Sequence, residues 1–262
     1  MIRNARLGLL ALAVSLLAAC ASSDGNTRGT SNFKSDETES EKAASLNKQL
    51  GTVYLRQGNL ALAKEKLERA EKYNPRDPET HSVLALLYEK LDIPAQVDEH
   101  YKTAMRLAPK NPQIINNYAV YLCKSGRVDP GVKLFLDAAR NPLYRTPELA
   151  YSNAGVCLRG AKRYEEAGNA FAHALQIRPN YAEAMFQAAD LRMERGEIAE
   201  GREQLDKYLE SYDATADLLL LGVRMARAQN DRMGEEKYTR RLRVEFAGSE
   251  QLRSLEPNRN PG

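Results

Sequence analysis

Small and large apolar residues recur along the chain at a nearly fixed interval. A glycine or alanine returns after 34, 34, 36, 34 and 33 residues, at Gly51, Ala85, Ala119, Gly155, Ala189 and Gly222. Sixteen residues after each of them stands a large apolar residue, namely Leu67, Tyr101, Phe135, Phe171, Leu205 and Tyr238. A period of this length is typical of stacked supersecondary units, so the pattern predicts a repeat protein.

Each period has the features of two antiparallel helices. The small residue lets two helix backbones approach closely, and the large residue fills the space beside their contact. Gly58, Gly126 and Gly196 follow the small residue by seven positions, where we expect the first helix to end in a left-handed cap. Pro94 and Pro130 lie just beyond that turn, where the first turn of a helix tolerates a missing N–H. The pattern therefore predicts helical hairpins.

These positions resemble the tetratricopeptide repeat (TPR), which has an aromatic residue or Leu eleven residues into each unit, here Tyr54, Tyr88, Leu122 and Leu158. The resemblance implies an all-α fold, a right-handed TPR superhelix of about six helix-turn-helix repeats. The repeats are expected at 44–77, 78–111, 112–147, 148–181, 182–214 and 215–248. Two extra residues around 144–147 break the period, and we expect a surface insertion there.

The segment before the repeats predicts a targeting signal followed by a flexible tether. Arg3 and Arg6 precede an apolar run over 7–19, which has the length of a secretory signal and is too short for a membrane span. The run ends at Leu17-Ala18-Ala19-Cys20, which resembles the lipobox of bacterial lipoproteins. That resemblance implies cleavage before Cys20, acylation of Cys20 and sorting to the outer membrane. The alternative is an ordinary signal peptide with an incidental cysteine.

The domain organisation follows from these segments. We expect a lipoprotein signal peptide over 1–19, then the lipidated Cys20 and a flexible polar tether over 20–43, since that stretch holds too little apolar surface to fold. The six repeats over 44–248 form the body. The residues over 249–262 are expected to form a frayed tail.

Charge excludes one class of partner. The 262 residues include 38 Lys and Arg against 35 Asp and Glu, a formal net charge of +3. Removal of residues 1–19 takes away Arg3 and Arg6 and leaves a charge of about +1. So small a basic excess argues against a nucleic-acid-binding domain, and we expect neither nucleic acid nor a small-molecule substrate as a partner.

In TPR proteins the first helices of the repeats line a groove, and the resemblance implies which residues face it. The candidate protein-binding residues are Lys48, Thr52, Leu55, Ser82, Leu86, Asn116, Val120, Ser152 and Val156. Their apolar members, flanked by amides and charges, fit a groove that binds a peptide or a helix. Alternatively, these side chains pack against neighbouring helices. A clamp for a terminal carboxylate, with Lys48, Asn117 and Asn153, is only faintly resembled.

Cys123 and Cys157 lie 34 residues apart on neighbouring first helices. In an oxidising periplasm two such thiols are disposed to form a disulfide, provided that their Cα atoms are about 5.5 Å apart. Their positions within the repeats differ by two residues, so two buried free thiols remain the alternative.

The sequence contains no motif that would identify an enzyme. A Gly-rich phosphate loop, a paired-His metalloprotease stretch, a nucleophile elbow and a Cys-x-x-Cys are all missing. We therefore expect no enzymatic activity, no cofactor and no metal site. His81 is expected to be a packing residue, and nothing in the sequence brings His81, His100 and His173 together.

A lipoprotein signal, a polar tether and six TPR units resemble the PilF/PilW family of type IV pilus biogenesis lipoproteins. The residues that carry this resemblance are the segments 50–58 and 60–63, Asn116-Asn117-Tyr118-Ala119, and a cysteine in each of the third and fourth repeats. The family implies a pilotin or stability factor that faces the periplasm. Its lipid would supply the address, and its groove would bind the pilus secretin and promote secretin localisation and multimerisation.

Two other functions fit a TPR lipoprotein. The chain could serve outer-membrane protein assembly, or it could be an adaptor for peptidoglycan hydrolases or a periplasmic protease. An enzyme whose site is assembled from unmarked residues is a third alternative.

Overall fold

The computed structural model describes residues 38–255, and its regular elements over that range are all helices. The expected signal peptide, Cys20 and most of the tether lie outside the described residues, as does the end of the tail. The helices are α1 (Glu39–Arg56), α2 (Leu60–Tyr73), α3 (Pro78–Lys90), α4 (Pro94–Leu107), α5 (Pro112–Lys124), α6 (Val128–Ala139), α7 (Pro147–Gly160), α8 (Tyr164–Ile177), α9 (Ala182–Glu194), α10 (Ile198–Ser211), α11 (Ala216–Ala228), α12 (Arg232–Glu245) and α13 (Glu250–Leu255).

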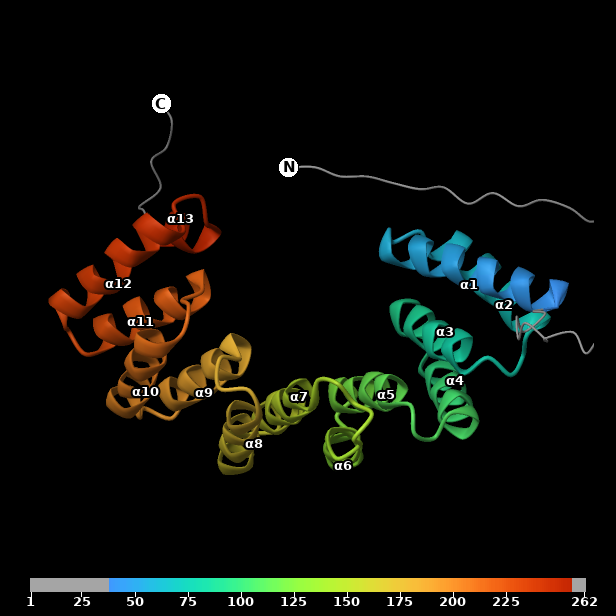
Figure 1. Cartoon of the computed structure of the whole chain (residues 1–262), viewed down its shortest axis with the longest axis horizontal. Coiled ribbons are helices and arrows are strands. Elements are labelled where there is room, and N and C mark those ends of the chain that lie inside the picture. Colours follow the sequence, from blue (N-terminus) through green and yellow to red (C-terminus); the bar gives the residue numbers. More distant parts are fainter. Residues whose placement is uncertain (1–37, 256–262) are drawn as a thin grey trace, which may run out of the picture. The chain divides into compact units, whose positions relative to one another are not determined.

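Consecutive helices form hairpins that stack in chain order. In each hairpin the odd-numbered helix packs against the helix that follows it, and the even-numbered helices from α2 to α10 also contact the next hairpin. Figure 1 shows this succession from α1 to α12, with α13 beside α11 and α12. Odd-numbered helices also contact one another, α5 with α7 and α7 with α9. The described residues thus confirm the all-α TPR superhelix.

The close approach predicted within each repeat is present. A Cβ added to Gly155 would overlap the ring of Phe171, which is fully buried, and a Cβ on Gly222 would lie 2.7 Å from Tyr238. Each pair consists of the small residue and the large residue sixteen positions later. The glycine is therefore required by contact between the two helices of the hairpin.

The left-handed turns between the helices of a hairpin also confirm the prediction. Gly58, Gly126 and Gly196 have φ of 76°, 77° and 79°. At the corresponding turns of the other three repeats the same conformation is adopted by Asp92, Lys162 and Asn230, with φ of 56° to 59°. The geometry of the turn is therefore set by the repeat, and glycine is the residue that adopts it without a steric penalty.

The first helix begins earlier than expected, since α1 starts at Glu39 and not at residue 44. Thr38 forms a capping box with Glu41: the Thr38 hydroxyl oxygen accepts from the Glu41 N–H, and the Glu41 carboxylate accepts from the Thr38 N–H. Polar residues are therefore helical over 39–43, since the cap satisfies backbone donors that the sequence pattern ignores.

Two other segments are more ordered than expected. Residues 250–255 form α13, which places Leu252 in a cluster with Leu219, Tyr238 and Leu242, so this part of the expected frayed tail packs on the last repeat. The insertion between the third and fourth repeats holds Tyr144, which is only 7% exposed and packs with Ile115. It is therefore not a simple surface loop.

In the structure a disulfide joins Cys123 of α5 to Cys157 of α7, with the two Cα atoms 5.6 Å apart. The bond forms although the two cysteines differ by two positions within their repeats. The bond links the third repeat to the fourth.

We predict that two glycines of α7 respond oppositely to alanine. Gly155→Ala should destabilise the fold by about 1–3 kcal/mol, because the new methyl group overlaps the Phe171 ring. Gly160→Ala should stabilise it by up to about 1 kcal/mol, since nothing lies within 4 Å and helical alanine is preferred to glycine. Urea unfolding of both variants measures the two effects, and a Gly155→Ala protein as stable as the wild type would disprove the contact.

Reduction of the disulfide should lower stability in a protein that has formed it. The chain-entropy estimate for a loop that spans 34 residues is about 4 kcal/mol. Thermal melts of the wild type with and without dithiothreitol measure the loss. A Cys123→Ser/Cys157→Ser double variant serves as the control, because its melting temperature should not respond to the reductant.

Candidate protein-binding groove

The first helices of the first two repeats are joined by an ion-pair cluster. The ammonium of Lys48 on α1 lies 3.0 Å from an oxygen of Asp77 and 2.7 Å from an oxygen of Glu79, at the start of α3. Burial alone lowers the pKa of Lys48, but the two carboxylates outweigh it and hold this pKa above its ordinary value. Lys48 is therefore charged and engaged within the protein, which removes the cation that a carboxylate clamp would need.

Side chains also link the first helices of later repeats. Lys124 donates to Glu89 at 2.9 Å, between α5 and α3. On α7, Arg159 donates through one nitrogen to Asp190 and through another to Glu194, both at 2.7 Å, and both acceptors are on α9. Together with the disulfide, these contacts link α1 to α3, α3 to α5, α5 to α7 and α7 to α9.

Three of the nine expected groove residues are buried in these helix contacts. Ser82, Asn116 and Ser152 are 5%, 5% and 2% exposed. The Asn153 side-chain amide donates to the Asn116 side-chain oxygen at 3.2 Å, between α7 and α5. For these positions the structure favours packing against a neighbouring helix over contact with a partner.

The other candidates on α1 and α3 are partly buried. The Thr52 hydroxyl donates to the Lys48 carbonyl oxygen at 2.8 Å, within α1. Leu55 and Leu86 both pack against the core of the first and second repeats. Only part of each of these three side chains is therefore accessible to a ligand.

Val120 and Val156 lie together at a hollow between α5 and α7. Its volume is about 500 Å³ and its lining is mainly apolar. Val156 is 45% exposed, a large fraction for an apolar side chain. The disulfide forms part of the wall, and Lys124 and Asn153 stand at its polar edge. We call this feature the α5–α7 hollow.

The α5–α7 hollow includes residues that the sequence did not mark as groove residues. Phe135 and Val128 of α6 and Ala161 of the turn after α7 contribute to its lining. Phe135 was recognisable only as the large core residue of the third repeat. It is only 1% exposed, so it forms part of the wall behind the hollow and offers little surface to a ligand.

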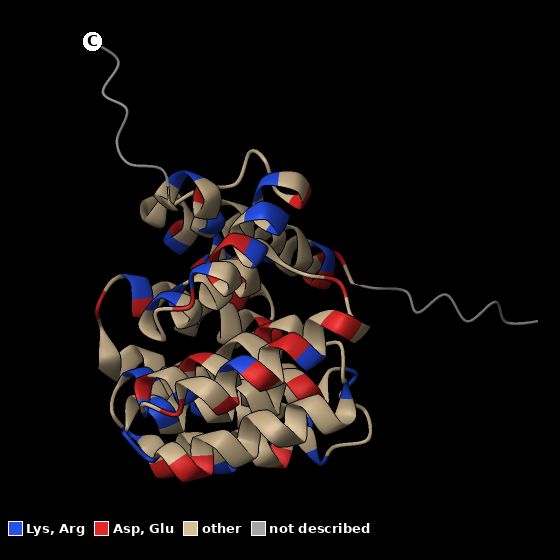
Figure 2. Cartoon of the chain, turned by 90° about the vertical axis from the view of Figure 1, so that its left-hand side faces the viewer, with Lys and Arg blue, Asp and Glu red and all other residues tan. Residues whose placement is uncertain are grey.

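A second hollow lies among α8, α9 and α10. Its volume is about 470 Å³, and Glu165, Arg192, Arg195 and Glu197 contribute to its lining. Acidic and basic residues also alternate along the helices in Figure 2, where both colours occur on the same ribbons. The apolar α5–α7 hollow is therefore the feature that best matches the predicted peptide groove.

The structure brings two of the three histidines together, a contact that the sequence did not indicate. The Nδ1 atoms of His81 and His100 lie 3.1 Å from each other, and both rings are buried. Burial, the largest influence, holds the pKa of His100 below its ordinary value. His173 is exposed elsewhere, beside Tyr151.

Among the helices within residues 38–255, none combines the length and the hydropathy of a membrane span.

Comparison with known proteins agrees with the repeats. Two sequence profiles of the tetratricopeptide repeat match residues 41–77 and 158–221. The chain is 28% identical to the type IV pilus assembly protein PilF of Pseudomonas aeruginosa, over 91% of this chain and 92% of PilF.

Solved structures show the same similarity. Pseudomonas aeruginosa PilF superposes with a TM-score of 0.63 and 26% identity, over 83% of this chain and 98% of that chain. PilW, described as a widely conserved type IV pilus biogenesis factor, gives the same TM-score and identity, over 82% of this chain and 98% of its own. With this shared fold and near-complete coverage, the chain is a PilF/PilW-like tetratricopeptide repeat protein.

Proposed function

We propose that this chain is an outer-membrane lipoprotein of type IV pilus biogenesis that acts as a pilotin. Its TPR array binds the pilus secretin, and the lipid on Cys20 carries the complex to the outer membrane, where the secretin multimerises. The protein works as an adaptor and catalyses no reaction. The observation that carries the proposal is the similarity to PilF along 91% of the chain.

The extent of the similarity supports a shared role. This chain and PilF cover nearly all of each other, so their similarity extends beyond one generic repeat. Isolated TPR units occur in many unrelated adaptors, and they would support only protein binding.

The α5–α7 hollow is our proposed contact for a segment of the secretin. An apolar peptide side chain placed between Val120 and Val156 would leave water. Lys124 pairs with Glu89, but its side chain is 63% exposed, so its ammonium can also pair with an acidic residue of the peptide. The other first-helix candidates are engaged in links within the array.

A charge in the hollow should weaken secretin binding. Val156→Asp places a carboxylate where an apolar partner would have to bury it, so the dissociation constant should rise at least about tenfold. Val244→Asp on α12 is the matched control, because Val244 is 78% exposed and lies outside the hollow. Binding of purified secretin is measured by biolayer interferometry.

Equal binding by both variants, with circular dichroism showing an unchanged fold, would exclude the hollow as the contact. It would leave the pilotin role open, since another part of the array could bind the secretin.

Localisation should depend on Cys20 and not on the repeats. Cys20→Ser removes the proposed acylation site, so the secretin should accumulate outside the outer membrane while the variant still binds it in a pulldown. Membrane fractionation and secretin multimers on gels provide the readout. Correct outer-membrane multimers in the Cys20→Ser strain would contradict the proposal.

The same strain separates the alternative functions. A defect in many outer-membrane proteins would favour a role in their assembly, and copurification of a hydrolase or protease would favour an adaptor for that enzyme. A defect confined to the secretin and pili fits the pilotin.

A further inference from the structure

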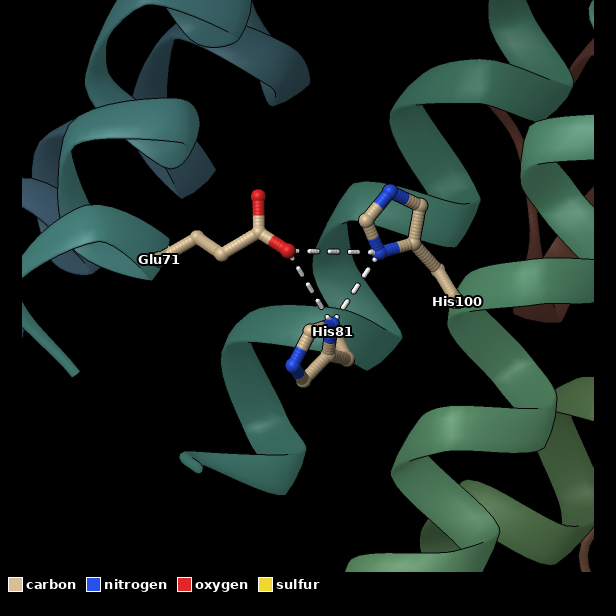
Figure 3. A group of neighbouring side chains, drawn as sticks. All are labelled: Glu71, His81 and His100. Carbon is tan, nitrogen blue, oxygen red and sulfur yellow. Dashed lines mark hydrogen bonds and ion pairs between the residues drawn. The ribbon is translucent and has the colours of Figure 1, made fainter. Parts of the chain in front are cut away.

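Three side chains converge where the first repeat meets the second. Glu71 projects from α2, His81 from α3 and His100 from α4, and Figure 3 shows their polar ends facing one another. The Nδ1 atoms of the two histidines are 3.1 Å apart. One Glu71 carboxylate oxygen lies 3.6 Å from Nδ1 of His81 and 4.0 Å from Nδ1 of His100.

The two imidazole rings are held in place. His81 and His100 are 5% and 7% exposed. The Tyr88 ring stacks on His100, with ring centroids 5.3 Å apart and planes 8° from parallel. The Nε2 atom of His81 lies 2.9 Å from the carbonyl oxygen of Pro75. These contacts fix the directions in which the Nδ1 atoms point.

The hydrogen bonds leave more acceptors than donors in the cluster. A carbonyl oxygen can only accept, so Nε2 of His81 carries its proton and Nδ1 presents a lone pair. If Nδ1 of His100 donates to that lone pair, the Glu71 carboxylate oxygen has no donor from either ring, since it lies beyond hydrogen-bond distance of both. The cluster therefore lacks a hydrogen-bond donor for Glu71, and a Lewis acid such as a metal cation could accept electron pairs from all three side chains.

The spacing of the three atoms suits a metal ion. The point equidistant from the corners of a triangle with sides of 3.1, 3.6 and 4.0 Å lies about 2.1 Å from each corner. Zinc binds histidine nitrogen at about 2.0–2.1 Å and carboxylate oxygen at about 2.0–2.2 Å. These distances allow the three atoms to reach one ion together.

We propose that Glu71, His81 and His100 form a binding site for a divalent zinc ion. The two Nδ1 atoms and one Glu71 oxygen are the protein ligands. Water completes the coordination on the side of Glu71, whose side chain is 34% exposed. The bond from Nε2 of His81 to the Pro75 carbonyl is the type of outer contact that orients histidine ligands in metal sites.

The ion would join the two hairpins at the start of the array. Glu71 belongs to the first repeat, and both histidines belong to the second, so coordination connects α2 with α3 and α4. Zinc binding would consequently stabilise the attachment of the first repeat, because only the folded stack brings the ligands together.

Zinc titration of the full chain tests the site. All proteins carry Cys20→Ser, because a free thiol is itself a zinc ligand, and are stripped with a chelator before calorimetry at about pH 7.5, where imidazole is neutral. We expect one ion per chain, with a dissociation constant of about 10 µM or below. Glu71→Gln and His100→Gln should each weaken binding at least about tenfold.

The exposed histidine supplies the matched control. His173→Gln should bind zinc as the parent does, since His173 lies on α8, away from the cluster. At a zinc concentration near the parent's dissociation constant, zinc should raise the melting temperature of the parent and of His173→Gln clearly more than that of Glu71→Gln. Cobalt should give visible absorption bands in the parent that are lost in His100→Gln.

Three results would overturn the proposal: no binding below about 100 µM, the same affinity in the parent and Glu71→Gln, or a loss of affinity in His173→Gln. Glu71→Gln keeps the test decisive if His100→Gln fails to fold, because Glu71 is partly exposed and replacement by glutamine preserves its size.

Discussion

The array depends on the close approach of the two helices in each hairpin. At Gly155 and Gly222 the facing aromatic ring occupies the space of a side chain, so the distance between the helices is fixed by contact and not by loop length. That distance brings the first helices of neighbouring repeats near enough to contact one another, which makes both the polar links and the α5–α7 hollow possible. The packing of the two helices within a repeat thus determines which contacts and hollows form between repeats.

The sequence predicted the structural features that recur in every repeat and missed those that occur once. The period revealed the hairpins, the small and large contact residues and the left-handed turns. The start of α1 and the short α13 were missed because a capping box at Thr38 and one buried Leu252 are local features outside the period. Tyr144 was missed for the same reason, since its packing depends on the insertion itself.

The candidate sites were predictable only in part, because they form between repeats. Position within the repeat suggested Ser82 and Val156 equally, yet Ser82 is buried against a neighbour and Val156 remains open to the hollow. Glu71, His81 and His100 come from three helices, and their spacing of 10 and 19 residues matches no short metal motif. The register between neighbouring hairpins determines whether such a side chain is buried, exposed or close to the other residues of a site.

The disulfide also has a mechanical consequence. A stack of repeats is elastic, because each unit contacts only its neighbours and the stack can bend at the interfaces between units. The covalent bond between α5 and α7 stiffens one interface, whereas α3–α5 and α7–α9 are linked by ion pairs that salt screens. Tension on the array would therefore be absorbed on either side of the α5–α7 hollow, and the shape of the hollow would persist under load.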